Sequence, residues 1–446
     1  MYLEDHFAPV VEEVTAHDLT VYGELPTELC GRYLRNGPNP FEITDPAKHH
    51  WFLGDGMVHG LRLRDGHAEW YRNRYVGSAA MSARRGIDDI AGPNWNGGAT
   101  GPNTNAGGFA GTTWATVEAG ACPVELDYEL ETVGRNDFHG TLPRGFTAHP
   151  KIDPVTGEMH AMTYAYPQFL DSVQYVVVGT DGRVRHSVDV PLESMTMMHD
   201  MSLTDRYAVV YDQPVTVNFD AMTDGYAFPF RWNPDTGNRV GLLPRAGTAD
   251  QIIWVDVPLA AHFHPMNAYD TADGRVVIDI CAQEKMFDID VLGPWGEPKM
   301  PRLERWDIDP LRRTSSVTVI DESPNEFPRH RHSVGGNAYR YGYSVSPSFG
   351  GMWATLKHDL VTGERQEFDH GLGRASGEPV FIAREGSVDE DDGWLVTFVH
   401  DGGRAEFVVI DAQDFSRGYV ARVELPQRVP FGFHGNWVSD RSVPPS

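Results

Sequence analysis

Two closely similar hexapeptides decide the interpretation of the fold: Asp-Pro-Val-Thr-Gly-Glu at 153–158 and Asp-Leu-Val-Thr-Gly-Glu at 359–364. Aspartate and glycine at such spacings are typical of tight turns between strands. We interpret the two segments as equivalent hairpin turns in two repeats of one structural unit.

Short β-rich runs, each followed by a turn signal, extend from about residue 110 to the end of the chain. Examples are Gln-Tyr-Val-Val-Val at 174–178 and Trp-Leu-Val-Thr-Phe-Val at 394–399. The chain has 446 residues, more than one domain usually contains, and no linker marks a domain boundary. The sequence therefore predicts an all-β protein. A propeller of several blades fits best, and two unrelated β-domains are the alternative.

The composition is that of a globular protein, with 41% hydrophobic and 22% charged residues. A formal net charge of −26 argues against a nucleic-acid partner, because phosphate binding requires clustered lysine and arginine. The three cysteines, Cys30, Cys122 and Cys281, contain no CxxC pair, which argues against a zinc ribbon or a disulfide framework. The sequence shows no secretory signal and no apolar run of transmembrane length, so we expect a cytoplasmic protein without a transmembrane segment.

Four histidines stand in β-type surroundings, far apart in the chain: His149, His199, His264 and His434. Inner strands of different propeller blades converge on the axis, so these residues can meet there. Four imidazoles suit zinc, copper, iron or nickel, although a single such histidine is more commonly a hydrogen-bonded core residue. His262 lies two positions before His264, and in an extended strand both would face one side.

Several long motifs resemble the carotenoid cleavage oxygenase family, also named the retinal pigment epithelial membrane protein family, in a bacterial-type member. They include Gly-Arg-Tyr-Leu-Arg-Asn-Gly-Pro-Asn-Pro (31–40), His-Trp-Phe-Leu-Gly-Asp-Gly-Met-Val-His-Gly (50–60), Phe-His-Pro-Met-Asn-Ala-Tyr-Asp (263–270) and Val-Pro-Phe-Gly-Phe-His-Gly-Asn-Trp-Val (429–438). The resemblance covers nearly the whole chain. It implies one seven-bladed β-propeller domain over residues 1–446, with long loops and short helices that form a cap over the site.

The resemblance also implies a metal centre. The family holds one Fe(II) per chain with four histidines and uses O2 as co-substrate. Matched motif by motif, the ligands, which act catalytically through the iron, are His149, His199, His264 and His434. The family's third-ligand pattern, His-x-x-Asn-Ala, is matched by His264 and not by His262.

Three glutamates at positions that match the family's motifs would orient the histidines: Glu118, Glu326 and Glu378. A neutral imidazole that binds a metal needs a partner on its other nitrogen, which supports this arrangement. Without the resemblance, each glutamate would be interpreted as a solvated acid. The four histidines and three glutamates, which we call the seven anchors, are separated along the sequence by about the length of one blade. The first gap, between 118 and 149, is shorter.

The expected reaction is oxidative cleavage of one carbon–carbon double bond into two carbonyl products. It requires no acid–base residue, in agreement with the absence of hydrolase and nucleotide-binding motifs. A retinoid isomerase would share the iron site. A propeller used only for binding and a zinc hydrolase are further alternatives.

The substrate is expected to be a small hydrophobic alkene. Stilbene-cleaving members resemble one another in carrying a lysine directly before the first glutamate and a tyrosine in the preceding loop. Here Val117 precedes Glu118, and the Gly/Asn-rich loop at 92–111 contains no tyrosine. We therefore favour a carotenoid or apocarotenoid over a stilbene or phenylpropene of the lignostilbene type; the substrate-binding residues and oligomeric state stay open.

Family members that take polyenes from membranes carry an apolar patch, which implies weak peripheral membrane contact. The segments 286–295 and 226–230 are candidates for such a patch, but we favour ordinary packing between blades for both. We also interpret Trp51, Phe52 and Met57 as packing residues and not as substrate contacts.

Overall fold

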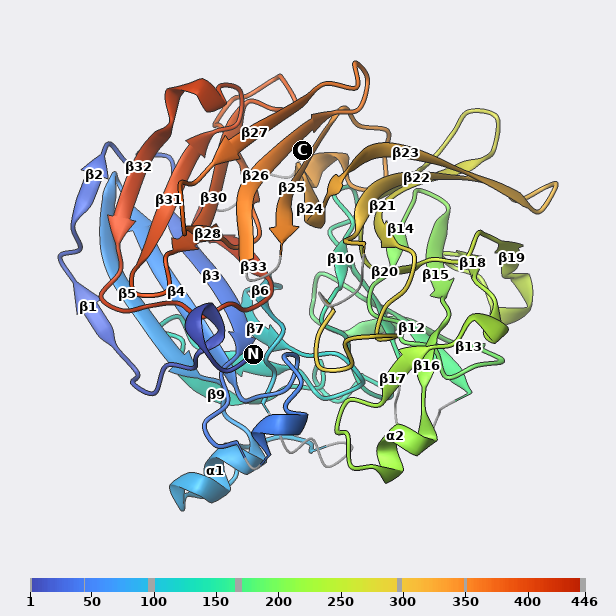
Figure 1. The fold of residues 1–446 in the computed structure, drawn as a ribbon, viewed down its shortest axis with the longest axis horizontal. Helices are drawn as coiled ribbons and strands as arrows, with labels where there is room; N and C mark the ends of the chain where they lie inside the picture. The colour runs from blue at the N-terminus through green and yellow to red at the C-terminus, as the bar shows by residue number, and fades with distance from the viewer. Residues whose placement is uncertain are drawn as a thin grey trace.

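A computed structural model describes residues 2–43, 45–94, 101–164, 171–294, 299–348 and 351–441. In these residues the strands form seven sheets of four or more strands, arranged in a ring (Figure 1), and one separate two-stranded hairpin. The predicted all-β propeller is confirmed and has seven blades. The prediction that residues 1–446 form a single domain stays a prediction.

Apart from segments at the two ends of the chain, the strands of successive blades follow one another along the sequence. Blade 1 contains β33 (Gly435–Ser439), β3 (Gly31–Pro38), β4 (Gly56–Arg64), β5 (His67–Tyr75) and β1 (Thr15–His17). Blade 2 contains β6 (Asn105–Phe109), β7 (Thr112–Thr116), β8 (Val124–Leu126) and β9 (Thr132–Arg135). Blade 3 contains β10 (Lys151–Ile152), β11 (Met159–Thr163), β12 (Ser172–Val178) and β13 (Val184–Pro191). Blade 4 contains β14 (Ser202–Leu203), β15 (Tyr207–Asp212), β18 (Arg239–Pro244) and β19 (Ile253–Asp256).

The remaining blades complete the ring. Blade 5 contains β20 (Ala261–Asp270), β21 (Val276–Gln283), β22 (Arg302–Asp309) and β23 (Thr314–Pro324). Blade 6 contains β24 (Glu326–His330), β25 (Tyr341–Ser348), β26 (Gly351–Asp359) and β27 (Arg365–Asp369). Blade 7 contains β28 (Ala375–Ser376), β29 (Val380–Ala383), β30 (Gly393–His400), β31 (Ala405–Asp411), β32 (Tyr419–Glu424) and β2 (Val21–Gly23). The separate hairpin is β16 (Val215–Val217) with β17 (Phe230–Trp232).

The ring is closed by both ends of the chain. The last strand, β33, pairs with β3 in blade 1, and the early strand β2 pairs with β32 in blade 7. Segments from the two ends therefore lie side by side, as the blue and red strands of Figure 1 show. Each closure replaces an exposed sheet edge with a paired one.

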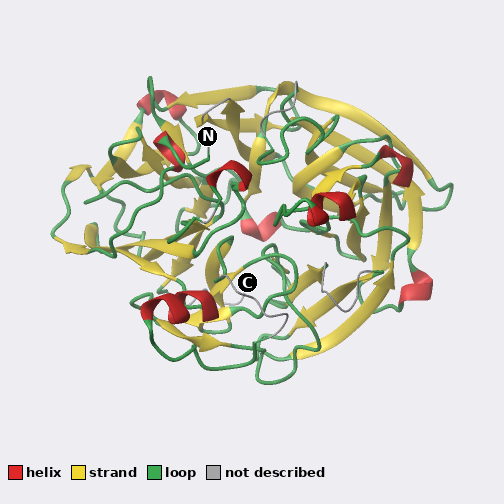
Figure 2. Ribbon diagram, turned by 60° about the horizontal axis from the view of Figure 1, so that its bottom comes forward, coloured by secondary structure: helices red, strands yellow, loops and turns green. Residues whose placement is uncertain are grey.

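Short helices lie among the loops that connect the strands (Figure 2). They are α1 (Ala79–Arg85), α2 (Phe219–Thr223) and the 3-10 helices η1 (Asp5–Phe7), η2 (Pro46–Lys48), η3 (Pro234–Thr236), η4 (Ala249–Gln251), η5 (His332–Val334) and η6 (Phe415–Arg417). Both α-helices lie on the same side of the ring in Figure 1. None of the described helices has the length and apolar character that crossing a membrane would require.

The core lies between neighbouring blades. Strand β21 is buried along its whole length, whereas outer strands such as β27 are mostly exposed. A strand in the middle of a propeller blade has a neighbour on both faces, which explains why the runs noted in the sequence are continuously apolar. The three cysteines carry free thiols, as expected.

The two hexapeptides have the same turn geometry but occupy different places in their blades. In each, the backbone N–H of the glycine donates to the aspartate carbonyl, at 2.9 Å for Gly157 and 2.8 Å for Gly363, and both glycines have a positive φ. The first turn joins β10 to β11, the first two strands of blade 3. The second joins β26 to β27, the last two strands of blade 6. The interpretation as equivalent positions of two repeats is therefore wrong, because turn chemistry is local and does not report which strands are joined.

Candidate metal centre

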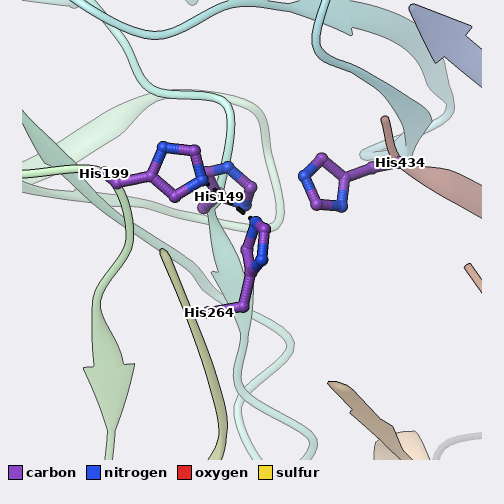
Figure 3. Close-up of side chains that lie close together, drawn as sticks. All are labelled: His149, His199, His264 and His434. Carbon is purple, nitrogen blue, oxygen red and sulfur yellow. Dashed lines mark hydrogen bonds between the residues drawn. The ribbon is translucent and has the colours of Figure 1, made fainter. Parts of the chain in front are cut away.

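The four histidines predicted as ligands lie together at the inner edges of four different blades. His149 and His199 lie two and three positions before the inner strands of blades 3 and 4. His264 lies in the inner strand of blade 5, and His434 directly precedes β33 of blade 1. One ring nitrogen of each lies within 4.8 Å of those of the other three. Figure 3 shows the four rings facing a common centre. All four side chains are buried.

The chemistry of the cluster fits a bound metal ion. Burial lowers the pKa of His149, His264 and His434, so these imidazoles are neutral and have a lone pair to offer. The Nε2 atoms of His199 and His264 are 3.0 Å apart. Nε2 of His149 is buried and has no hydrogen-bond partner among the described residues. Convergent, neutral nitrogen donors with one unsatisfied atom are what a first-row transition metal requires.

Three of the histidines contact a glutamate through the nitrogen that faces away from the cluster; Glu326 and Glu378 are buried, and Glu118 is partly exposed. The distances from Nδ1 to the carboxylate oxygen are 2.5 Å for His199 and Glu118, and 2.6 Å for His264 and Glu326. For His434 and Glu378 the distance is 3.2 Å. When Nδ1 carries the proton and donates to the carboxylate, Nε2 is left free to bind a metal.

The fourth histidine has a different neighbour. Nδ1 of His149 is 3.9 Å from Oδ2 of Asp200, which is too far for a hydrogen bond. Asp200 is itself held by Lys151, whose ammonium group lies 2.8 Å from the carboxylate. The sequence reasoning missed this pair. The sequence hints at this pair only through its position, since Asp200 follows His199 directly and Lys151 is two positions after His149.

Each of the seven anchors belongs to its own blade. Glu118 belongs to blade 2, Glu326 begins the inner strand of blade 6, and Glu378 lies between β28 and β29 of blade 7. The short first gap has a structural reason. Glu118 follows the second strand of its blade, β7, whereas the next anchor, His149, precedes an inner strand.

The glutamates differ in electrostatic environment. Burial raises the pKa of Glu326 to about 8. Burial also opposes ionisation of Glu378, but Arg329 and His434 outweigh it and lower the pKa of Glu378 to about 2. Nη2 of Arg329 donates to Glu378 at 2.8 Å. Arg329, three positions after Glu326, is a second residue that sequence reasoning missed.

Two cavities meet at the histidine cluster. One, the apolar cavity, has a volume of about 270 Å³ and is lined by aromatic side chains together with Val117, Glu118 and Tyr164. The other, the polar cavity, has a volume of about 240 Å³ and is lined by charged and polar side chains. His264 and His434 line both. The aromatic wall of the apolar cavity contains Trp51, Phe52, Phe228, Phe230, Phe263 and Phe327. The polar wall contains Lys151, Asp200, Asn267, Arg329, His330 and His332.

These cavities add to two sequence interpretations. Met57 is fully buried in the core, and Trp51 and Phe52 pack in a hydrophobic cluster, as expected. Trp51 and Phe52 also line the apolar cavity, and the prediction that they do not contact substrate stays a prediction. In segment 286–295, Met286 and Phe287 are buried while Ile289 is 63% exposed, and Trp295 lies outside the described residues. Weak peripheral membrane contact through this segment stays a prediction.

His262 does not join the cluster, although it lies in β20 with His264. The pairing of β20 with β21 is irregular between His262 and Pro265, so the strict alternation of side chains is broken. The His262 ring instead lies 4.7 Å from the ring of Tyr211 and 5.7 Å from that of Trp306. It is a core residue between blades.

Comparison with known proteins supplies the family. The family described as retinal pigment epithelial membrane protein matches residues 7–439. A carotenoid cleavage oxygenase of Mycobacterium tuberculosis is 41% identical, over 98% of this chain and 97% of that protein. A carotenoid 9,10(9',10')-cleavage dioxygenase of Crocus sativus is 33% identical, over 99% and 90%.

Solved structures share the fold. A lignostilbene dioxygenase of Pseudomonas brassicacearum superposes with a TM-score of 0.87 at 27% identity, over 98% of both chains. A cobalt-substituted apocarotenoid oxygenase (ACO) of Synechocystis gives a TM-score of 0.85 at 25% identity, over 97% of both chains.

Proposed function

Because the chain belongs to the retinal pigment epithelial membrane protein family, which includes carotenoid cleavage oxygenases, we propose that it is a non-haem Fe(II) dioxygenase. The proposed reaction is cleavage of one carbon–carbon double bond of a carotenoid or apocarotenoid, with O2, to aldehyde or ketone products. The cytoplasmic location expected from the sequence stays a prediction.

The ligands proposed for the iron are the four clustered histidines, His149, His199, His264 and His434. Bound Fe(II) would supply the redox chemistry with O2. The chain's own part is to orient the four imidazoles towards one centre. The glutamates do this for three of them. Glu326 and Glu378 are hydrogen-bonded to Nδ1 of His264 and of His434, and Glu118 lies 2.5 Å from Nδ1 of His199. Each contact directs Nε2 to the centre.

The observation that carries the choice of substrate is the wall of the apolar cavity. Aromatic side chains surround the approach to His199, His264 and His434, and no lysine or arginine is among the described residues that line it. Such a wall binds an apolar polyene by area and shape and excludes water. It provides no cation to bind or ionise a phenol, and Val117 occupies the position where stilbene-cleaving members carry lysine.

The second candidate is a stilbene or phenylpropene. It is favoured by the similarity in fold to a lignostilbene dioxygenase. Two features count against it: Val117 at the cavity, and the hydroxyl group of Tyr164, which already donates to Glu118 at 2.6 Å. The carotenoid-cleaving relatives also match at higher identity.

The test is to incubate Fe(II)-loaded protein separately with an apocarotenal and with resveratrol, and to record O2 uptake and product masses. We expect O2 uptake and two carbonyl products from the apocarotenal. Cleavage of resveratrol alone would overturn the choice of substrate. Rearrangement without O2 uptake would instead indicate an isomerase, and activity restored by zinc after removal of iron would indicate a hydrolase.

A further inference from the structure

The three glutamates of the centre are held by three kinds of donor: a guanidinium group, backbone N–H groups and a hydroxyl group. Glu378 accepts hydrogen bonds from the guanidinium group of Arg329 at 2.8 Å and from the backbone N–H of Gly435 at 3.0 Å. Glu326 accepts a hydrogen bond from the backbone N–H of Phe327 at 2.5 Å. For Glu118 the recorded partner besides His199 is a neutral side chain, since the hydroxyl of Tyr164 donates to Oε2 at 2.6 Å.

Tyr164 belongs to both the apolar cavity and the metal centre. It directly follows β11 of blade 3, is 3% exposed, and lines the apolar cavity with Glu118. Its ring centroid lies 6.0 Å from that of Phe230, another residue of the cavity wall. Burial, followed by the charge of Glu118, raises the pKa of Tyr164 well above its ordinary value, so the phenol keeps its proton and is the donor.

A carboxylate with one partner is poorly fixed. The terminal torsion of glutamate is broad, so a second contact restricts the orientation of the carboxylate. Oε1 of Glu118 contacts Nδ1 of His199 at 2.5 Å, and the Tyr164 hydroxyl holds the other oxygen. In a wall of mostly aromatic side chains, this donor also offsets part of the cost of partly burying the Glu118 charge.

We propose that Tyr164 is a positioning residue of the metal centre: its hydroxyl fixes the Glu118 carboxylate and, through it, the His199 imidazole, while its ring forms part of the substrate wall. The inference rests on the proposed function in that the four histidines bind a metal ion. It adds a residue that links the wall of the apolar cavity to one ligand of that ion.

The test is a double-mutant cycle on cobalt affinity, since a structural neighbour has been obtained with cobalt in place. Metal-free wild type, Tyr164→Phe, Glu118→Gln and the double variant are titrated with Co(II). Changing a group that orients a metal ligand costs about 10–100-fold in affinity, and we expect this for Glu118→Gln. Tyr164 contacts Glu118 and not the ligand itself, so Tyr164→Phe should weaken Co(II) binding by roughly 3–10-fold. Because Tyr164 acts through Glu118, the double variant should bind Co(II) less than about 2-fold more weakly than Glu118→Gln alone.

The visible absorption of bound Co(II) gives a readout that a structural role would not move. The spectrum should change between wild type and Tyr164→Phe, and should not change between Glu118→Gln and the double variant. The matched control is Tyr175→Phe, which removes a buried hydroxyl that lies 2.7 Å from Nδ1 of His160, away from the centre. It should leave affinity and spectrum unchanged, and melting temperatures of the metal-free variants check folding.

Two results would overturn the proposal. One is an unchanged Co(II) affinity and spectrum in Tyr164→Phe. The other is an equal loss of affinity when Tyr164→Phe is introduced into wild type and into Glu118→Gln. Failure of wild type to bind Co(II) at all would count against the proposed metal centre, which separates the two hypotheses.

Discussion

The apolar and polar cavities share two histidines and differ in almost everything else. The apolar cavity presents aromatic faces, and its two acids, Glu118 and Glu326, each contact a histidine. The polar cavity presents ionic groups, of which Lys151 and Asp200 form a pair.

The difference extends to how each cavity supports the centre. On the polar side a guanidinium group, that of Arg329, holds Glu378. On the apolar side a neutral hydroxyl, that of Tyr164, holds Glu118. A guanidinium in an aromatic wall would be costly to desolvate, whereas a buried phenol supplies a hydrogen bond with little charge. Each wall therefore uses a donor that suits its own polarity, which keeps the apolar side free of cations.

The largest expected effect concerns the histidines shared by the two cavities. His264→Ala should abolish binding of iron, because it removes a nitrogen from the centre of the cluster. His262→Ala should leave iron in place, since that ring packs between blades and lines neither cavity. Metal content after Fe(II) loading and gel filtration measures both. The reverse outcome would reject the assignment of the ligand.

A charge placed in each cavity tests the difference in wall chemistry. Phe228→Asp puts a carboxylate into the apolar wall, where an apolar substrate would have to desolvate it, so kcat/KM for a polyene should fall by about 100-fold. His332→Asp makes the matched change at the exposed rim of the polar cavity and should alter kcat/KM by less than about 3-fold. Steady-state kinetics decide the matter, and equal losses would mean that substrate contacts both walls.

The ion pair of the polar cavity should matter more for stability than a surface pair. Lys151→Met leaves Asp200, 2% exposed at its side chain, without its cation, and we expect the free energy of unfolding to fall by about 2 kcal/mol. Lys299→Met breaks a pair with Glu284 in which both side chains are 65% exposed, and should cost less than about 1 kcal/mol. Urea unfolding compares the two variants; a larger loss at Lys299 would contradict the comparison.

The smallest expected effect concerns a histidine outside both cavities. Burial lowers the pKa of His59 to about 3, and the side chain is 4% exposed. The folded state therefore favours the neutral form. Its stabilising contribution is present above the unfolded pKa of about 6.5 and is lost as the pH falls from there towards 3, by roughly 1.4 kcal/mol per pH unit. Unfolding of wild type and His59→Gln at pH 7.5 and 5.5 should show a weaker pH dependence in the variant, and identical slopes would refute the assignment.

Much of the candidate site could be inferred before the fold was known. The motif around His264 separated that residue from His262, although strand periodicity alone allowed both. The three glutamates were placed by the same kind of match, and the structure brings each within 3.2 Å of a clustered histidine. Their role as metal ligands and orienting partners stays a prediction until metal is measured.

Other features could not be inferred, because they depend on contacts between blades. Tyr164 meets Glu118 across 46 positions of sequence, and Lys151 meets Asp200 across 49. Neither pair forms a pattern along the chain. The sequence gives no sign that Trp51 and Phe52 line a cavity, because an aromatic side chain in a core and one in a cavity wall look alike in a sequence.

The sequence by itself determined the local chemistry: apolar strand runs, the two aspartate–glycine turns, and the residue types able to bind a metal. These depend on neighbours along the chain, so a linear pattern contains them. Only the tertiary structure decided which strands each turn joins, which donors hold the glutamates, and which wall of the centre is apolar. Those features arise from the packing of seven blades around one axis, where distance along the chain no longer predicts distance in space.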